Sequence, residues 1–351
     1  MEQQHPKKKS LFKKIGFGIL LCILFAGAVI TYTVYQRYFT PNVSGVEPYL
    51  YIRTGSTFED VMQNLGEKEL LKDTASFRWA AKQMGYPSRV KPGKYRLEER
   101  MNNRTLINTL GGGFQEPVKL RFQDIRLKEQ FANYISTQLE PDSLSLIQLL
   151  NSDTLAAKYG FNRDNFFCMF IPNTYEFYWN TSADRFFERM HEEYDKFWTP
   201  ERKAKADSIQ LTPIQVSVLA SIVKGEALHT DEMPKIAGLY LNRLRRGMLL
   251  QADPTVIFAV NDFTIRRVLN KHLLVNSPYN TYIYKGLPPG PIMMPSIAAI
   301  DAVLNYQQHD FLYMVAKEDF SGYHNYSKTM AEHLQNARKF QQALNERNIK
   351  K

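Results

Sequence analysis

The feature that most constrains this chain is an uncharged run of twenty-one residues near its start, Ile15 to Tyr35, which reads IGFGILLCILFAGAVITYTVY. As a helix rising 1.5 Å per residue, this run spans about 31 Å, the thickness of the hydrocarbon core of a bilayer. It therefore predicts a transmembrane helix. Five lysines precede it (Lys7, Lys8, Lys9, Lys13 and Lys14). By the positive-inside tendency, they predict a cytoplasmic N-terminus, with everything after residue 40 on the other side.

The alternative interpretation of this start is a signal peptide that is removed. The apolar run is longer than the usual apolar region of a signal peptide, and no Ala-x-Ala precedes a polar boundary. We therefore expect a cytoplasmic tail over 1–14, a membrane helix over 15–35 and a linker over 36–46. This predicts a single-pass protein of the inner (cytoplasmic) membrane whose folded part is periplasmic or otherwise extracytoplasmic.

Composition excludes several classes of protein. The 351 residues are 44% apolar, enough for a core and for two domains. Two cysteines are too few for a disulfide framework or a zinc ribbon. The net charge of +10 suggests nucleic acid, but residues 1–40 alone carry six cations and one acid, half of the excess. The remaining charges are interspersed, so we expect no nucleic-acid partner.

Two similar stretches follow the expected linker, about 43 residues apart in the sequence. Tyr51-Ile52-Arg53 leads into FEDVMQNLG, and Tyr95-Arg96-Leu97 leads into RTLINTLG. Each is typical of a short strand, a capping turn and a helix that ends in glycine. They predict a small α+β module over 47–116. A glycine run, 111–113, closes it and lacks the Lys-Ser/Thr of a phosphate-binding loop.

From about residue 117 the chain becomes more helical and more aromatic, which predicts a larger mixed α/β domain over 117–351 and an α+β fold for the whole chain. We expect amphipathic helices at about 296–306 and from Met330 onward. The intervening segments 277–284 and 286–295 are too rich in turn-forming residues to be core elements. Irregular segments held by rigid helices are where sites tend to be built.

The chemically unusual residue is Glu226. It follows Pro213 to Val223, a stretch that is apolar nearly all round and therefore predicts a buried helix. Burial and the negative end of the helix dipole both raise the pKa of a carboxyl group there. A glutamic acid that stays protonated near neutral pH can act as a general acid, for example on a glycosidic oxygen. The alternative is a helix-ending glutamate paired with Lys224, Arg243 or Arg245.

Downstream, polar side chains of short reach alternate with apolar ones at Gln251, Asp253 and Thr255. This alternation predicts three hydrogen-bonding groups on one side of an extended strand, a row that suits the hydroxyl and acetamido groups of sugars. The alternative is an Asx-type turn that Asp253 starts before Pro254.

The ordered motifs of the second half are Ala220-Ser221-Ile222-Val223-x-x-Glu226, Asn242-Arg243-Leu244-x-x-Gly247-Met248-x-Leu250-Gln251-x-Asp253-Pro254-Thr255-Val256, Tyr279-Asn280-Thr281-Tyr282, Gly286-Leu287-Pro288-Pro289-Gly290-Pro291-Ile292 and His324. Together they resemble the membrane-anchored endolytic murein transglycosylases of the MltG/YceG-like family. The resemblance extends to the anchor and to the small module, which is LysM-like in the family. It covers essentially the whole chain.

The resemblance implies cleavage of nascent peptidoglycan strands between N-acetylmuramic acid and N-acetylglucosamine, which leaves a 1,6-anhydromuramyl end. The family's catalytic acid is the second Glu of an Ile-Val-Glu-x-Glu pattern and falls on Glu226, whereas the first Glu is Lys224 here. An ammonium so near would oppose a rise in the pKa of Glu226.

One carboxyl group suffices for this reaction, because the C6 hydroxyl of the substrate replaces an enzymic nucleophile and water. Glu226 would act first as acid and then as base. Our candidates for contacts with the substrate are Gln251, Asp253, Thr255, Asn280, Tyr282 and His324. We expect no metal and no other cofactor. The expected partners are glycan strands, the inner membrane and peptidoglycan synthases.

Two other functions stay open. A muramidase would use Glu226 as the acid and Asp253 to activate water, giving reducing ends in place of anhydro ends. A non-catalytic glycan-binding scaffold of the wall-synthesis machinery would use the anchor and the module without chemistry at Glu226.

Overall fold

The computed structural model describes residues 8–44 and 48–347. The chain forms two compact units, and each is described by itself. The first comprises Met1–Val118 with Phe177–Asn180, and the second comprises Lys119–Glu176 with Thr181–Lys351.

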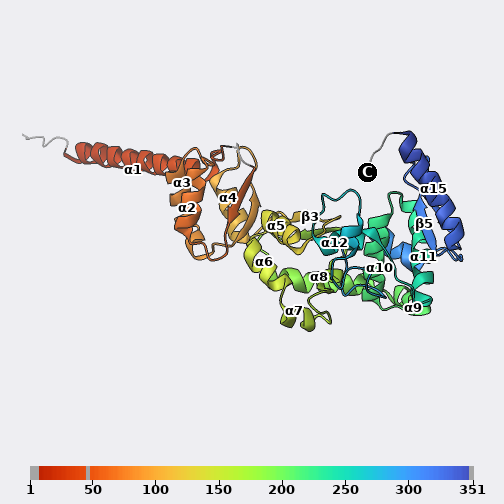
Figure 1. Cartoon of the computed structure of the whole chain (residues 1–351). Helices are drawn as coiled ribbons and strands as arrows, with labels where there is room; N and C mark the ends of the chain where they lie inside the picture. The colour runs from red at the N-terminus through yellow and green to blue at the C-terminus, as the bar shows by residue number, and fades with distance from the viewer. Residues whose placement is uncertain (1–7, 45–47, 348–351) are drawn as a thin grey trace, which may run out of the picture. The chain divides into compact units, whose positions relative to one another are not determined.

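The first unit combines one long helix with a small α+β module (Figure 1). Its elements are α1 (Lys8–Phe39), β1 (Tyr49–Ile52), α2 (Phe58–Glu67), α3 (Thr74–Gln83), a 3₁₀ turn (Tyr86–Ser88), β2 (Gly93–Arg96) and α4 (Asn103–Gly112). Strands β1 and β2 pair antiparallel, with Tyr49 opposite Arg96 and Ile52 opposite Gly93. The two predicted strand–turn–helix repeats are thus confirmed as β1–α2 and β2–α4. The side chains of Thr57 and Asn102 cap the two helices.

Helix α1 is long and apolar enough over Phe12–Phe39 to cross a membrane. Helix α1 begins at Lys8, within the segment 1–14 for which we expected a cytoplasmic tail. Residues 1–7 of that tail lie outside the described residues. The prediction of a linker over 36–46 is wrong for residues 36–39, because the helix continues to Phe39. Pro41 and Val43 then form isolated bridges to Asn102 and Leu71, so this segment packs on the module. Residues 45–47 of that linker lie outside the described residues.

The end of α1 is held by the module. The Nδ2 group of Asn103 donates to the carbonyl oxygen of Arg37 at 2.8 Å, and the Asn103 side chain is buried. The Arg37 guanidinium lies over the Trp79 ring, 4.8 Å from its centre. Helix α1 therefore packs directly on α3 and α4.

The second unit is helix-rich with two small sheets. Its elements are β3 (Val118–Arg121), α5 (Lys128–Gln138), α6 (Ser143–Leu150), α7 (Asp153–Lys158), a 3₁₀ turn (Phe166–Met169), β4 (Thr174–Phe177), α8 (Ala183–Phe197), α9 (Pro200–Ser208), α10 (Pro213–Glu226), a 3₁₀ turn (Thr230–Glu232), α11 (Met233–Arg245), α12 (Asp253–Val260), α13 (Asn270–Leu273), α14 (Ile297–Leu304), β5 (Tyr313–Ala316), β6 (His324–Ser327) and α15 (Met330–Glu346). Strand β3 pairs with β4, and β5 pairs antiparallel with β6. The predicted mixed α/β character is confirmed.

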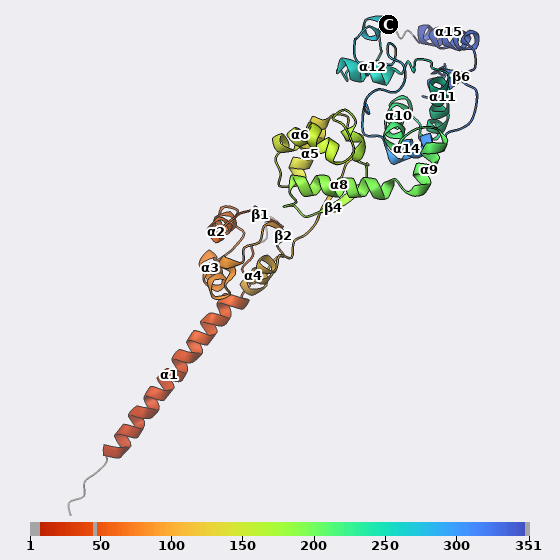
Figure 2. The same cartoon turned by 90° about the horizontal axis from the view of Figure 1, so that it is seen from below.

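Helix α10 forms the centre of this unit. Its start has Pro213 in the first turn and a capping box between Thr212 and Gln215, both strong start signals. Every residue from Val216 to Val223 is buried. Helices α11, α12 and α14 pack around it, and both views show α10 beside α11 (Figure 2). The prediction of a buried helix is confirmed.

The segment 286–295 differs from its prediction. It has no regular secondary structure, yet Ile292, Met293 and Met294 are buried. Its backbone groups find partners inside the protein: the N–H of Ile292 donates to the Ser221 hydroxyl at 3.1 Å, and that of Met294 donates to the Ile125 carbonyl at 2.9 Å. Because these groups are satisfied, an irregular segment can lie in the core.

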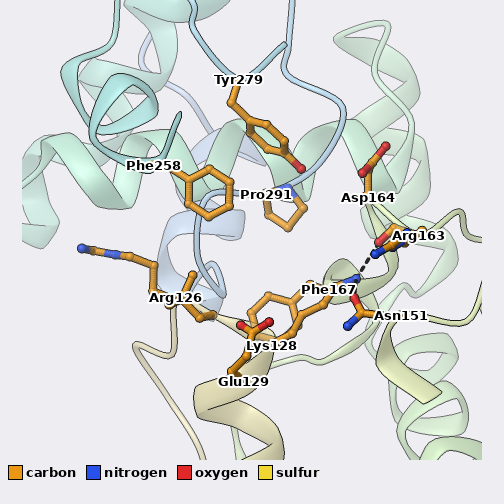
Figure 3. A pocket seen from close by; sticks show the side chains of 11 residues that line it. Arg126, Lys128, Glu129, Asn151, Arg163, Asp164, Phe167, Phe258, Tyr279 and Pro291 are labelled. Atoms are coloured by element: carbon orange, nitrogen blue, oxygen red, sulfur yellow. Dashed lines mark hydrogen bonds between the residues drawn. The ribbon is translucent and has the colours of Figure 1, made fainter. Parts of the chain in front are cut away.

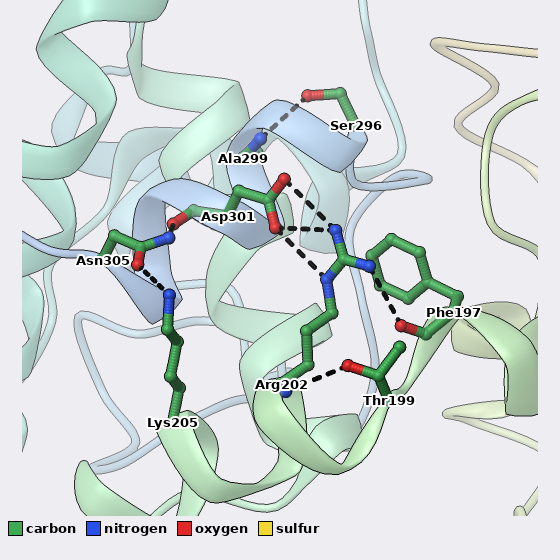
Figure 4. A network of polar contacts seen from close by, with 8 residues as sticks. All are labelled: Phe197, Thr199, Arg202, Lys205, Ser296, Ala299, Asp301 and Asn305. Carbon is green, nitrogen blue, oxygen red and sulfur yellow. Dashed lines mark hydrogen bonds and ion pairs between the residues drawn. The ribbon is translucent and has the colours of Figure 1, made fainter.

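Helix α14 is fixed to α9 by a polar network (Figure 4). The Arg202 guanidinium binds Asp301, with Nη2 and Oδ1 3.1 Å apart, and Lys205 donates to Asn305. Arg202 also lies over the Phe197 ring, 4.0 Å from its centre. This network joins α9 to α14, which itself packs against α10.

Candidate active site

A cavity of about 320 Å³ lies in the second unit at the end of α10. Helices α10, α11 and α12 and strands β5 and β6 contribute its walls. The residues that line it are Glu226, Leu239, Tyr240, Arg243, Leu250, Gln251, Asp253, Tyr282, Met314, Val315, Ala316 and His324.

Glu226 is the last residue of α10 and points its carboxyl group into this cavity. Burial raises the pKa of Glu226 to about 7, against the opposing effect of a hydrogen bond that the Tyr240 hydroxyl donates to Oε1 at 2.7 Å. The negative charge of Asp253 raises the pKa further, and the positive charge of Arg243 lowers it. The net result favours a carboxyl group that can both give and take a proton near neutral pH.

Among the residues that the structure describes, Glu226 forms no ion pair with Lys224, Arg243 or Arg245, although the charge of Arg243 acts on it. The Lys224 ammonium lies 3.5 Å from Asp124, and Arg245 donates to the Tyr306 hydroxyl at 3.1 Å. The Lys224 ammonium pairs with Asp124 and is not among the largest influences on the pKa of Glu226.

Arg243 builds the cavity wall. Its buried guanidinium donates from Nε to the Leu312 carbonyl at 2.6 Å and from Nη1 to the Leu250 carbonyl at 2.7 Å. These bonds join α11 to the start of α12 and to strand β5. Arg243 therefore holds three walls of the cavity together while its charge stays near Glu226.

Four predicted substrate contacts line the cavity with Glu226: Gln251, Asp253, Tyr282 and His324. The Tyr282 hydroxyl donates to Asp253 Oδ1 at 2.6 Å. The extended strand predicted over 251–255 is wrong. Gln251 has a left-handed backbone with φ of 52°, and Asp253 begins α12 with Pro254 in its first turn. Proline fits the first turn of a helix, where its missing N–H would have no partner.

Thr255 and Asn280 do not line the cavity, so their prediction as direct substrate contacts is not supported by their positions. Both are fully buried. The Thr255 hydroxyl donates to the Ala252 carbonyl at 2.7 Å. Asn280 donates to two backbone carbonyls, and its Oδ1 accepts from the backbone N–H of Tyr282 at 3.0 Å. The two residues instead position the turn that carries Tyr282 and the start of α12.

The sequence gives no signal for two polar residues of the site: Tyr240, which lines the cavity, and Glu232, which binds the cavity residue His324. Tyr240 lies in an apolar helical stretch and resembles a core residue, and Glu232 ends a short acidic turn. Glu232 Oε2 lies 2.9 Å from His324 Nδ1, although the two residues are 92 positions apart. No local pattern signals a pair at such a separation.

A second cavity, of about 220 Å³, lies beside α5 and α12 (Figure 3). Three cations and two acids line it: Arg126, Lys128, Arg163, Glu129 and Asp164. The half-buried Lys128 donates from its ammonium group to the carbonyls of Leu150 and Arg163 at 2.9 and 2.7 Å, and thereby joins these two segments of the main chain. This cavity contains none of the predicted site residues. Within residues 8–44 and 48–347, no group of three or more His, Cys, Asp or Glu could hold a metal ion.

Comparisons with known proteins agree with the family resemblance of the sequence. The model of the YceG-like family matches residues 50–339. An endolytic murein transglycosylase of Bacillus subtilis (strain 168) is 27% identical over 316 residues, covering 84% of this chain and 85% of the relative. One of Streptococcus pneumoniae serotype 2 is 27% identical over 335 residues, covering 86% of this chain and 60% of the relative. The crystal structure of a yceG-like protein of Listeria monocytogenes shares the fold, with a TM-score of 0.56 and 24% identity over 82% of this chain and 97% of that one.

Proposed function

Because the chain belongs to the YceG-like family, we propose that it is a lytic transglycosylase that cleaves peptidoglycan glycan strands internally, between N-acetylmuramic acid and N-acetylglucosamine. The observation that carries this proposal is the Glu226 carboxyl group, which lies in a polar cavity and has a pKa raised by burial to about 7. The names of the Bacillus and Streptococcus relatives support the same activity.

Glu226 performs both proton transfers in this reaction. Its protonated carboxyl group donates to the bridging oxygen as the bond from C1 of the muramyl residue to that oxygen breaks. The C6 hydroxyl oxygen then bonds to C1, and its proton passes to the Glu226 carboxylate, which restores the acid. A pKa near the working pH suits both steps, since the donor and acceptor forms are then both well populated. The Tyr240 hydroxyl orients the carboxyl group through its bond to Oε1.

The other polar groups of the cavity bind the sugar. Gln251, Tyr282 and His324 line it together with Glu226. Their dipoles would stabilise the positive charge that develops on the ring.

A muramidase mechanism is the second candidate, because the Asp253 carboxylate lies in the same cavity. That carboxylate already accepts a hydrogen bond from the Tyr282 hydroxyl at 2.6 Å. It is therefore partly engaged, and the lyase route needs no base to activate water. A glycan-binding scaffold is the third candidate, but binding alone gives no reason for a half-buried carboxyl group with a raised pKa.

The substitution Glu226→Gln separates these functions. On uncrosslinked glycan strands, the full chain in lipid vesicles should produce anhydro ends, visible by mass spectrometry, and the variant should lose about 10²- to 10⁴-fold in rate. Glu318→Gln makes the same change at an exposed residue outside the cavity and should be fully active. Full activity of Glu226→Gln would exclude Glu226 as the acid, and reducing ends one water heavier would favour the muramidase.

We propose further that α1 is an uncleaved anchor in the inner membrane and that the second unit lies outside the cytoplasm. The packing of the last turn of α1 on α3 and α4 supports an anchor over a leader that is removed. We assign the module of the first unit as LysM-like, an assignment supported by the order β1–α2–α3–β2. An association with peptidoglycan synthases stays a prediction from the family resemblance.

A further inference from the structure

His324 lines the same cavity as the proposed catalytic acid and is paired with Glu232. We propose that Glu232 is a positioning residue that fixes His324, so that the Nε2 atom of His324 accepts a hydrogen bond from a sugar hydroxyl of the bound glycan. This inference rests on the proposed function, because it assumes that the cavity around Glu226 takes a sugar.

Both carboxylate oxygens of Glu232 bind the same residue. Oε1 accepts from the backbone N–H of His324 at 2.8 Å, and Oε2 lies 2.9 Å from the ring atom Nδ1. The two side chains are 4% and 14% exposed, so water competes little for these bonds. An ionised carboxylate only accepts hydrogen bonds, and Nδ1 must therefore carry a proton.

The proposal places the ring proton on Nδ1 alone, which leaves a lone pair on Nε2. His324 lines the same cavity as Glu226 and Tyr282. Within the part of the chain that the structure describes, Nε2 of His324 has no hydrogen-bond partner. An acceptor held in one orientation at a polar cavity suits a hydroxyl donor, and sugars carry several.

A purely structural role is the competing explanation, since Glu232 precedes α11 and His324 begins β6. In that case the pair would only fasten the β5–β6 hairpin to the helix. The two roles differ in one respect: only the proposed role depends on which ring nitrogen carries the proton.

The substitution Glu232→Gln tests this dependence, because it keeps both hydrogen bonds and reverses one of them. The amide oxygen must face the backbone N–H of His324, which can only donate. The amide NH₂ group then faces Nδ1 and donates to it, so the ring proton moves to Nε2. Nε2 would then present a donor to a sugar hydroxyl that was itself donating. A site that mismatches one substrate hydroxyl should lose about 10- to 100-fold in kcat/KM.

The first measurement needs no activity. Solid-state NMR of the full chain in lipid vesicles, with ¹⁵N-labelled histidine, distinguishes the two neutral ring forms. The His324 signal is assigned by its loss in His324→Gln. We expect Nδ1–H in the wild type and Nε2–H in Glu232→Gln. An unchanged ring form in the variant, or Nε2–H in the wild type, overturns the proposal.

The second measurement is kinetic. Glu232→Gln should lower kcat/KM for release of anhydro ends while the thermal unfolding midpoint is retained, and it should cause no further loss in a His324→Gln background. Glu318→Gln is the matched control, because Glu318 is exposed and accepts from Asn325 on the same hairpin. Additive losses, or an unchanged kcat/KM in Glu232→Gln, would leave Glu232 a structural residue and overturn the proposal. If the wild type releases no anhydro ends, the proposed function fails instead, and the NMR result still stands by itself.

Discussion

Glu226 shows how one side chain is tuned by opposing effects of its surroundings. Burial favours the neutral acid, whereas the Tyr240 hydroxyl and the charge of Arg243 favour the carboxylate. Burial is the largest effect and therefore wins, but the hydrogen bond keeps the pKa at about 7. A carboxyl group with burial alone would bind its proton too tightly to pass it on.

The raised pKa of Glu226 makes stability depend on pH. In the unfolded chain its pKa is about 4.5, and in the folded chain about 7. The folded state therefore holds a proton that the unfolded state loses as pH rises through this window, so folding becomes less favourable until about pH 7 and then levels off. Above pH 7, folding must bury a carboxylate that the unfolded chain keeps in water. Glu226→Gln removes this charge and should stabilise the protein by about 1–3 kcal/mol there. At pH 4.5 and below, the gain should be small. Denaturant unfolding at both pH values measures it, and a gain that is independent of pH would contradict the assigned pKa.

Tyr240→Phe tests the hydrogen bond that lowers the pKa of Glu226. The hydroxyl bond lowers the pKa of Glu226, so its removal should raise that pKa above about 7. If protonated Glu226 is the acid, the alkaline fall in kcat/KM should move to higher pH. A pH profile on glycan strands measures this shift, with Tyr284→Phe as a control because Tyr284 is exposed and bonds Asn276 outside the cavity. A shift to lower pH would contradict the role given to Tyr240.

The sequence alone identifies some of these residues and not others, for physical reasons. Glu226 stands out because a stretch that is apolar all round must be buried, and a carboxyl group at its end is then unusual. Tyr240 and Glu232 do not stand out, because their roles come from partners 14 and 92 positions away. Thr255 and Asn280 were predicted as substrate contacts because their polarity is visible in the sequence, whereas the direction of their side chains is not.

At the scale of elements, the site depends on the close approach of α10 to α12. Gly225 precedes Glu226, and a Cβ added there would lie 2.8 Å from Pro254 Cβ. A proline ring cannot rotate out of the way, so the start of α12 would have to move. Asp253 lies in that first turn, and its place relative to Glu226 would change with it.

Gly225→Ala should therefore lower activity more than stability. Alanine favours a helix over glycine by about 1 kcal/mol, which offsets part of the steric cost of about 1–3 kcal/mol. We expect a small loss in unfolding free energy and roughly a tenfold loss in kcat/KM, as a displaced catalytic wall implies. Gly66→Ala in α2 is the matched control, because nothing lies within 4 Å of the added atom. If both variants are equally stable and active, the approach of α10 to α12 does not matter.

The sequence predicts a helix or strand well where its local signals agree, and poorly where two signals favour different structures. Helix α10 follows from its apolar residues and its capping signals alone. At 251–255 the alternating pattern indicates a strand, but Pro254 sits where a helix can begin, and the helix prevails. In segment 286–295 the turn-forming residues predict irregular structure correctly. They do not predict its burial, which depends on the distant partners Ser221 and Ile125.

At the scale of the molecule, helix α1 and the α+β module of the first unit pack together as one structure. The buried Asn103 side chain bonds the Arg37 carbonyl and the Ser76 hydroxyl, each at 2.8 Å, and accepts from Asn42 at 2.7 Å. A free linker, as the sequence predicts over 36–46, would leave the Asn103 amide without its partner on α1. The orientation of the module is thus set by the helix that precedes it.

Two truncated chains test this coupling. A chain that begins at residue 41 loses the Arg37 carbonyl and the cover over Trp79, whereas one that begins at residue 33 keeps both. Loss of one partner of a buried polar group costs about 1–3 kcal/mol, so the shorter chain should have the less stable module. Protease digestion within residues 48–118, followed as a function of temperature, measures that stability. Because the groups that line the cavity all lie between 226 and 324, both chains should cleave isolated glycan strands at the same rate. Equal protease resistance would mean that the contacts of α1 add nothing, and that the helix only tethers the module.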